Sequence, residues 1–112
     1  MNKRKIGALY EQFAAEYLAG LGYELIETNY RCPLGEIDLV ARDGVYFVFV
    51  EVKYRKNLNT GSPFEAVNAK KQQTIRRAAQ WYLTERKLSD VPVRFDVAGI
   101  LGKEIKVIKD AF

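Results

Sequence analysis

Several residue types are absent or rare in this 112-residue sequence, and each absence excludes particular kinds of metal site, catalytic group or cross-link. There is no histidine, which excludes imidazole metal ligands, a Ser-His-Asp triad and imidazole acid–base catalysis. Cys32 is the only cysteine, so one chain forms neither an internal disulfide nor a cysteine-rich zinc site. No apolar stretch approaches membrane-spanning length, and Glu11 and Glu16 interrupt what would be a signal-peptide core. We expect an unprocessed, cytoplasmic protein without a membrane segment.

The residues that are present favour one folded domain with an anionic partner. Hydrophobic residues make up 48% of the chain, which is enough to build a core at this length. Lys and Arg number 18 against 14 Asp and Glu, giving a net charge of +4 and a pI near 9.2. This modest basic excess favours nucleic acid as a partner. With no repeat or linker, we expect a single domain over residues 1–112.

Helical periodicity occurs twice. The first helix is predicted from Ile6 to near Gly20, with an apolar stripe at helical spacing: Ile6, Leu9, Tyr10, Phe13 and Tyr17. The second is predicted to begin at Ser62-Pro63-Phe64-Glu65, which reads as an N-cap, a first-turn proline and a capping-box glutamate. It should end near Lys87 and bury Ile75, Ala78, Ala79, Tyr82 and Leu83.

Between and after these helices the periodicity is that of strands. Extended segments are predicted at 23–31, 35–41, 45–55, 93–100 and 104–109. Asp43-Gly44 is typical of a two-residue hairpin loop, which would pair Val40 with Phe47 and Asp38 with Phe49. The predicted order is therefore α-β-β-β-α-β-β, an α/β fold.

This hairpin register would gather polar side chains on one face of the sheet. Glu36, Asp38, Glu51 and Lys53 would lie at the end away from the turn, and Ile37, Leu39, Val48 and Val50 would face the core. Asp38 and Glu51 would be diagonal neighbours roughly 7–8 Å apart. Two carboxylates at that separation favour a shared Mg²⁺ or Mn²⁺, which polarises a phosphodiester and activates water. Lys53 would orient that water or stabilise phosphate charge.

An ordinary structural interpretation of the same residues stays open. The carboxylates could form a solvated strand end at which Lys53 simply pairs with Glu51. Glu11 lies about 140° around the first helix from Ile6, as an ordinary boundary glutamate would. Trp81 and Tyr54 could stack on bases, although aromatic residues in small domains more often pack inside.

Three blocks of this sequence resemble a known family. They are Asn29-Tyr30-Arg31, Gly35-Glu36-Ile37-Asp38-Leu39-Val40, and Val48-Phe49-Val50-Glu51-Val52-Lys53-Tyr54-Arg55. Together they resemble the signature blocks of the YraN-like uncharacterised bacterial proteins. These proteins in turn resemble Holliday-junction resolvases and the PD-(D/E)xK nucleases. The resemblance implies a restriction-endonuclease-like fold, a mixed central sheet flanked by helices.

The resemblance also implies roles for individual residues. Asp38 and Glu51 would be metal ligands together with the Val52 carbonyl, and Lys53 would complete the Glu-x-Lys motif. Glu11 resembles a first-helix glutamate that joins the metal shell in many of these nucleases. Here Ile37 stands where the motif has proline. Related resolvases act as dimers, so the resemblance allows a homodimer.

Three function hypotheses follow. The first is a Mg²⁺- or Mn²⁺-dependent nuclease acting on DNA, with branched DNA suggested by the resemblance, and the second is a non-catalytic nucleic-acid-binding module on the same fold. The third is a protein-interaction domain that uses an exposed aromatic end of the hairpin. For either nucleic-acid hypothesis, the candidate phosphate contacts are Arg31, Arg55, Lys56, Lys70 and Arg77.

Overall fold

The computed structural model describes residues 3–112, which form one five-stranded sheet and two long helices. In chain order the elements are α1 (Lys3–Gly20), β1 (Glu24–Cys32), β2 (Gly35–Asp43), β3 (Tyr46–Arg55), the short 3-10 helix η1 (Leu58–Thr60), α2 (Ala69–Glu85), β4 (Val93–Leu101) and β5 (Glu104–Ile108). The strands lie side by side in sequence order. Only β3 and β4 pair in parallel, which requires the long crossover through α2. The predicted α/β fold with a mixed sheet is confirmed.

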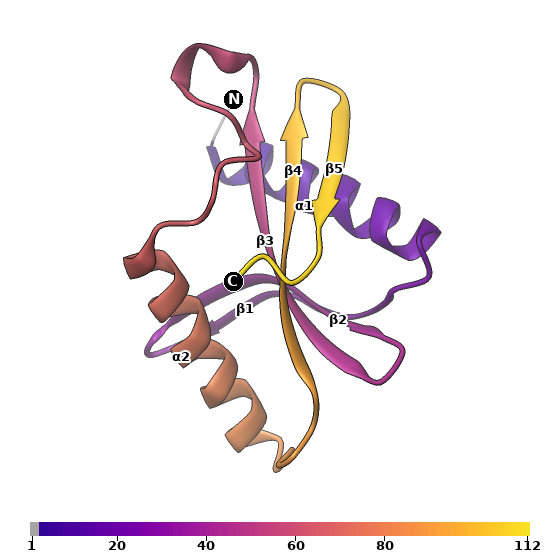
Figure 1. Ribbon diagram of the computed structural model, residues 1–112, viewed down its shortest axis with the longest axis vertical. Coiled ribbons are helices and arrows are strands. Elements are labelled where there is room, and N and C mark those ends of the chain that lie inside the picture. The colour runs from indigo at the N-terminus through magenta and orange to yellow at the C-terminus, as the bar shows by residue number, and fades with distance from the viewer. Residues whose placement is uncertain (1–2) are drawn as a thin grey trace.

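The two helices cover opposite faces of the sheet (Figure 1). On one face, Ala14, Ala15 and Leu18 of α1 pack with a cluster that includes Leu39, Val48 and Val50. On the other face, the apolar residues of α2 pack with Val40, Phe49 and Phe95. Phe49 is completely buried, whereas Tyr46 beside the hairpin turn is 40% exposed, so the predicted exposed aromatic end of the hairpin is formed only in part. No helix within residues 3–112 is both long and apolar enough to cross a membrane.

The packing face of α2 is as predicted, but its start is not. Ile75, Ala78, Ala79, Tyr82 and Leu83 are all buried. The helix begins at Ala69, where the Asn68 side chain accepts a hydrogen bond from the Lys71 backbone N–H at 2.8 Å. The Ser62–Glu65 segment instead closes a separate turn. Its Ser62 N–H donates to Glu65 Oε1 at 3.2 Å, so the capping-box residues pair locally without starting a helix.

The packing face of α1 differs from the predicted stripe. Leu9, Phe13 and Tyr17 are exposed, whereas Ala14, Ala15 and Leu18 are buried. Apolar residues occupy more than half of this helix, so two faces compete for the sheet, and the small alanines allow the closer approach. The face that wins follows the 11, 14, 15, 18 spacing. It therefore turns Glu11 toward the sheet, whereas the predicted stripe would leave it at the boundary.

The hairpin register is shifted by two residues from the prediction. Asp43 pairs with Tyr46 and Val40 with Phe49, so the loop residues are Gly44 and Val45. Gly44 is the first loop residue and has a φ of +62°. In the predicted loop Asp43 would have been the first residue and would have needed that positive φ, which glycine adopts more easily. A shift of two preserves which residues share a face. Its consequence is to bring Asp38 opposite Glu51.

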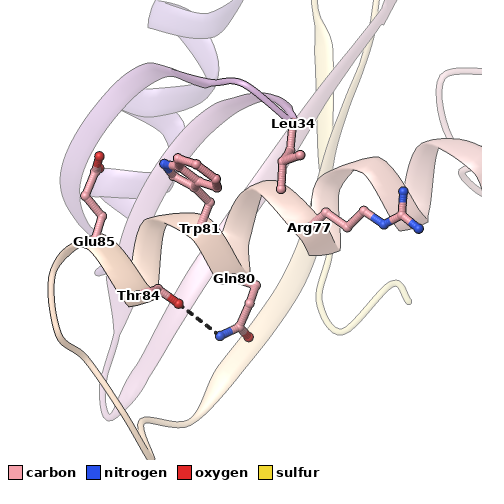
Figure 2. Close-up of a pocket in the computed structure, with 6 residues that line it drawn as sticks. All are labelled: Leu34, Arg77, Gln80, Trp81, Thr84 and Glu85. Carbon is pink, nitrogen blue, oxygen red and sulfur yellow. Dashed lines mark hydrogen bonds between the residues drawn. The ribbon is translucent and has the colours of Figure 1, made fainter.

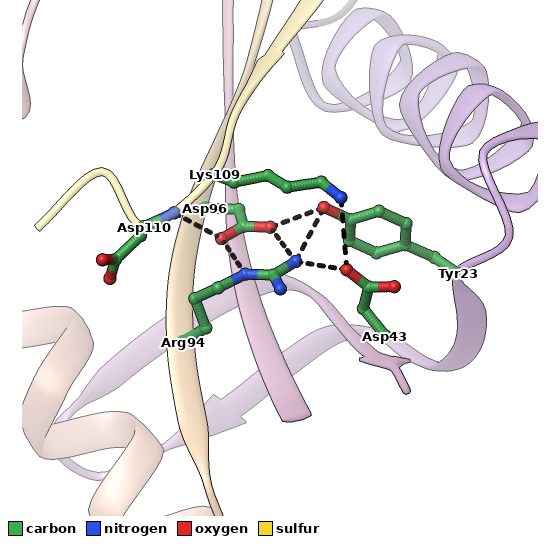
Figure 3. Close-up of polar contacts among 6 residues, drawn as sticks. All are labelled: Tyr23, Asp43, Arg94, Asp96, Lys109 and Asp110. Carbon is green, nitrogen blue, oxygen red and sulfur yellow. Dashed lines mark hydrogen bonds and ion pairs between the residues drawn. The ribbon is translucent and has the colours of Figure 1, made fainter. Parts of the chain in front are cut away.

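A buried polar network joins the elements at the hairpin-turn end of the sheet (Figure 3). Asp96 on β4 is completely buried and accepts hydrogen bonds from Arg94, from the Tyr23 hydroxyl at 2.7 Å and from the Asp110 N–H at 3.0 Å. Arg94 also reaches Asp43 at 2.8 Å. The Arg94 guanidinium holds the pKa of Asp43 below its usual range. This network fixes β4 to the hairpin and to the segment after α1.

Gly99 on β4 is required for a close approach between the sheet and the loop before α2. A Cβ at this position would lie 2.5 Å from a Phe64 ring carbon and 2.9 Å from the Pro63 carbonyl oxygen. We expect Gly99→Ala to lower the free energy of unfolding by about 1–3 kcal/mol, because the loop must move. Denaturant unfolding measures the change. Gly20→Ala, where an added Cβ meets nothing, is the control, and equal stability of both variants would contradict this packing.

Candidate functional site

The candidate site lies where β2 and β3 separate. Regular pairing of the two strands ends at Leu39 and Val50, and the next two residues are Asp38 and Glu51. The Val52 N–H donates to Asp38 Oδ2 at 2.8 Å, so a side chain continues the ladder. The two carboxyl groups are also close enough to share a hydrogen bond. They are thus direct neighbours, closer than the diagonal spacing predicted from sequence.

Both carboxyl groups are held in a desolvated environment. Burial raises the pKa of Asp38, and burial together with the charge of Asp38 raises the pKa of Glu51 to about 8. The nearest cation is Lys71 on α2, whose ammonium group is 3.7 Å from Glu51 Oε2. The Glu51 side chain is only 14% exposed, against 49% for Lys71. Without a further cation, this pair favours a shared proton near neutral pH.

Glu11 joins the same cluster from α1. One of its carboxylate oxygens, Oε2, is buried and has no hydrogen-bond partner among the described residues. Burial and the charge of Asp38 raise the pKa of Glu11, and a hydrogen bond with Asn29 partly offsets them. Asn29 has a φ of +52° within β1, a conformation that asparagine tolerates better than most residues. The three carboxyl groups therefore come from three different elements.

The pKa of Glu51 implies that the metal-free protein loses stability as pH rises. The folded state holds a proton up to about pH 8, whereas the unfolded state loses it near the usual glutamate value of about 4.5. We expect the free energy of unfolding to fall by about 4–5 kcal/mol across that window, since each pKa unit corresponds to about 1.4 kcal/mol. Glu51→Gln should remove most of the slope, and Glu104→Gln on β5 should not. Urea unfolding at several pH values in chelator measures it, and identical slopes would refute the assignment.

The cluster opens onto a two-lobed cleft divided by Lys71. One lobe has a volume of about 640 Å³ and includes Glu11, Asn29, Arg31, Glu36 and Asp38. The other, of about 490 Å³, includes Glu51, Lys53 and Arg55. Lys71 lines both lobes. A ligand that reaches the carboxyl groups from either lobe therefore passes the Lys71 ammonium group.

Lys53 lies in the second lobe but does not pair with Glu51. Its ammonium group donates to the Glu65 backbone carbonyl at 2.8 Å, which ties β3 to the Ser62–Glu65 turn. The simple Lys53–Glu51 ion pair considered above is therefore wrong. Lys71 takes that position, which sequence periodicity does not indicate, because a contact between a helix and a strand depends on tertiary packing.

The five candidate phosphate contacts are not gathered in one patch. Arg31 lies in the first lobe, where it pairs with Glu36 at 3.4 Å, and Arg55 lies in the second. Lys70 is the exposed neighbour of Lys71. Lys56 lines a separate apolar groove beside α1, and Arg77 lines a pocket farther along α2. Only Arg31, Arg55 and Lys70 thus lie at or beside the cleft.

The cluster fits a hard divalent cation by its chemistry and charge. Its donors are carboxylate oxygens, and Val52 on β3 lies beside them with its N–H bonded to Asp38. Burial of several carboxyl groups, one with an orphaned oxygen, leaves a deficit of positive charge that Lys71 offsets only in part. Within residues 3–112, no three acidic or thiol groups converge as a preformed metal centre. Asp38 and Glu51 are therefore the pair that would hold the ion first.

Comparisons with known proteins extend over nearly the whole chain. The model of the Uncharacterised protein family UPF0102 matches residues 10–100. A UPF0102 protein of Lachnoclostridium phytofermentans is 50% identical over 113 aligned residues, covering 100% of this chain and 96% of the relative. One from Acetivibrio thermocellus is 46% identical, covering 99% and 93%. The matched range includes Glu11, Asp38, Glu51 and Lys71, and the predicted membership of an uncharacterised bacterial family is confirmed. The chain belongs to the UPF0102 family.

Proposed function

We propose that this protein is a metal-dependent nuclease that hydrolyses phosphodiester bonds in DNA. The observation that carries the proposal is the buried, unpartnered oxygen of Glu11 beside the Asp38–Glu51 pair. Buried polar atoms in folded proteins are nearly always hydrogen-bonded, and exceptions of this kind cluster at functional sites. A cleft with acidic residues and an ammonium group suits an anionic substrate bound through a cation.

The roles follow from what each side chain contacts. Asp38 and Glu51 would hold Mg²⁺ or Mn²⁺ with the Val52 carbonyl, and Glu11 would add a further oxygen. The bound ion supplies Lewis-acid activation of the phosphate and a nucleophile from water at neutral pH. Lys71, already 3.7 Å from Glu51, would stabilise charge on the phosphate oxygens. Lys53 would need to exchange its bond with the Glu65 carbonyl for a phosphate or water.

One observation favours a non-catalytic nucleic-acid-binding module as the second candidate. The Lys53 ammonium group donates to the backbone of the neighbouring turn, as expected of a structural lysine. In that case the carboxyl cluster would hold a proton and organise the cleft without cleaving. Phosphate binding would then rest on Arg31, Arg55 and Lys70.

The test is cleavage by purified protein in Mg²⁺ or Mn²⁺, with chelator as the negative control. Junction, single-stranded and duplex DNA of matched sequence are compared, since phosphate-directed contacts do not by themselves select a structure. We expect metal-dependent cleavage that disappears in Glu51→Gln protein. Cleavage that persists in both Glu51→Gln and Asp38→Asn proteins would show that the activity comes from elsewhere. Salt-sensitive binding with no cleavage of any substrate would favour the second candidate.

A further inference from the structure

A second pocket lies on the exposed side of α2, apart from the carboxylate cleft. Its volume is about 390 Å³, and its lining is almost entirely apolar at the surface. Figure 2 shows the six residues around it: Leu34 from the β1–β2 turn, and Arg77, Gln80, Trp81, Thr84 and Glu85 from α2. The cleft described above contains none of them. The pocket therefore needs its own explanation.

Trp81 is the residue that makes this pocket unusual. Trp81 is 40% exposed, and Leu34 beside it is 46% exposed. Among the described residues, no aromatic ring or cation stacks on the indole. Tyr54, the other aromatic residue considered for stacking, already lies on Tyr10, with ring centroids 3.6 Å apart. An available indole beside an aliphatic side chain offers a flat surface for a ring.

The charges around the pocket favour an anionic ligand. Arg77 lies at one end, and Lys70 lies two turns earlier on the same side of the helix. Neither has a carboxylate partner within residues 3–112. The one acidic residue, Glu85, is already paired with Arg86 at 3.1 Å and accepts the Tyr30 hydroxyl at 3.3 Å. A ligand with a flat apolar ring and a negative charge would satisfy both features.

The pocket and the carboxylate cleft both border α2. Lys71 and Trp81 are ten residues apart, or about 15 Å along the helix axis. That span corresponds to about four nucleotides at the 3.4 Å spacing of a stacked strand. The β1–β2 turn connects the sites from the other side, since Leu34 lines the pocket and Glu36 the cleft. Gly35 between them packs against Thr74, where a Cβ would be 2.7 Å from the side chain.

We propose that this pocket binds an unpaired nucleobase stacked on Trp81, with the adjoining phosphates passing Arg77 and Lys70 toward the cleft. This inference rests on the proposed nuclease function and assigns its substrate class, a nucleic acid with a single-stranded segment beside the cleavage position. Duplex DNA hides its base faces in the stack, so it would reach the cleft without filling the pocket. The Gln80 amide, which also lines the pocket, donates to the Thr84 hydroxyl at 3.3 Å.

The single tryptophan of the chain makes the test direct, because all indole fluorescence comes from Trp81. Asp38→Asn protein in chelator is titrated with short oligothymidylate, so that binding is measured without cleavage. We expect saturable quenching by the single strand and little quenching by a duplex. By anisotropy of labelled oligonucleotide, Trp81→Ala should bind about 10-fold more weakly or worse, and Trp81→Phe should recover part of the loss. Arg77→Gln should reduce the slope of log affinity against log salt concentration by about 1, as expected for the loss of one phosphate contact.

The outcomes separate this inference from the proposed function. Saturable binding without any fluorescence change, and with no loss in Trp81→Ala, would overturn the base pocket and leave the nuclease proposal intact. Quenching together with an absence of metal binding and cleavage would overturn the nuclease proposal alone. A third outcome is tryptophan fluorescence that depends on protein concentration, together with a dimer in sedimentation that the Trp81→Ala substitution dissociates. It would show that a second copy of the chain covers the pocket. That result would overturn the inference.

Discussion

Asp38→Asn is expected to lower metal-dependent cleavage by about 10³-fold or more while leaving the protein folded. The Val52 N–H donates to Asp38 Oδ2 at 2.8 Å, and the amide oxygen of Asn could accept the same hydrogen bond. The contact between β2 and β3 at this position is therefore kept. The substitution removes the negative charge that would hold the cation between β2 and β3. A 10³-fold loss corresponds to about 4 kcal/mol of transition-state stabilisation. Initial cleavage rates at saturating metal and substrate measure it.

The matched control for Asp38→Asn is Glu36→Gln. Glu36 lies on the same strand, two residues away, and lines the same lobe, but it is exposed and paired with Arg31. We expect its substitution to change the rate by less than about fivefold, because an exposed ion pair contributes little. Similar losses in both variants would mean that the general charge of the lobe, and not a cation held by Asp38, supports activity.

Asp96→Ala is expected to cause the largest loss of stability, about 3–5 kcal/mol in free energy of unfolding. Asp96 is completely buried and has hydrogen-bond donors from Arg94, Tyr23 and Asp110. Removing the carboxylate leaves the Arg94 guanidinium, which is only 12% exposed, with Asp43 as its one remaining carboxylate partner and the Tyr23 hydroxyl as a neutral one. Denaturant unfolding at neutral pH measures the loss.

The control for Asp96→Ala is Glu104→Ala on β5, an exposed position where we expect a change within about 0.5 kcal/mol. Asp43 is the last residue of β2 and lies five strand residues from Asp38, or about 17 Å, so the network is well separated from the carboxyl cluster. Folded Asp96→Ala protein should therefore keep its metal affinity. A stability loss below about 1 kcal/mol would show that the Arg94–Asp96 pair is not structurally important.

The helices show what periodicity predicts and where it fails. The buried face of α2 follows directly from Ile75, Ala78, Ala79, Tyr82 and Leu83, because mostly polar residues occupy the rest of the helix, with Trp81 as the one large apolar exception. On α1, large side chains such as Phe13 and Tyr17 mark one face, but the sheet packs against the face with Ala14 and Ala15. Choosing between two apolar faces depends on how closely the helix can approach the sheet, which hydrophobicity alone does not encode.

The candidate site was likewise predictable only in part, because local periodicity places residues on a strand face but does not show which residues of other elements reach them. Face parity placed Asp38 and Glu51 on one side of the hairpin even though the register was shifted by two residues. Lys71 was not found, because its contact with Glu51 depends on where α2 crosses the sheet. The Asp96 network was also missed, because its partners Tyr23 and Asp110 come from segments outside β4. The Arg94-x-Asp96 spacing, which places both residues on one strand face, was the available sign.

Calorimetric titration of Mn²⁺ tests the central claim most directly, because it examines the carboxyl cluster without assuming a substrate. Wild-type, Asp38→Asn and Glu36→Gln proteins are compared at low salt, above and below pH 8, with circular dichroism to check folding. The account predicts saturable binding to wild-type and Glu36→Gln protein. Binding should tighten as pH rises through about 8, where Glu51 loses its proton, and should be lost in Asp38→Asn. Equal binding to all three proteins, or none to folded wild-type protein at high pH, would contradict a metal site at Asp38 and Glu51.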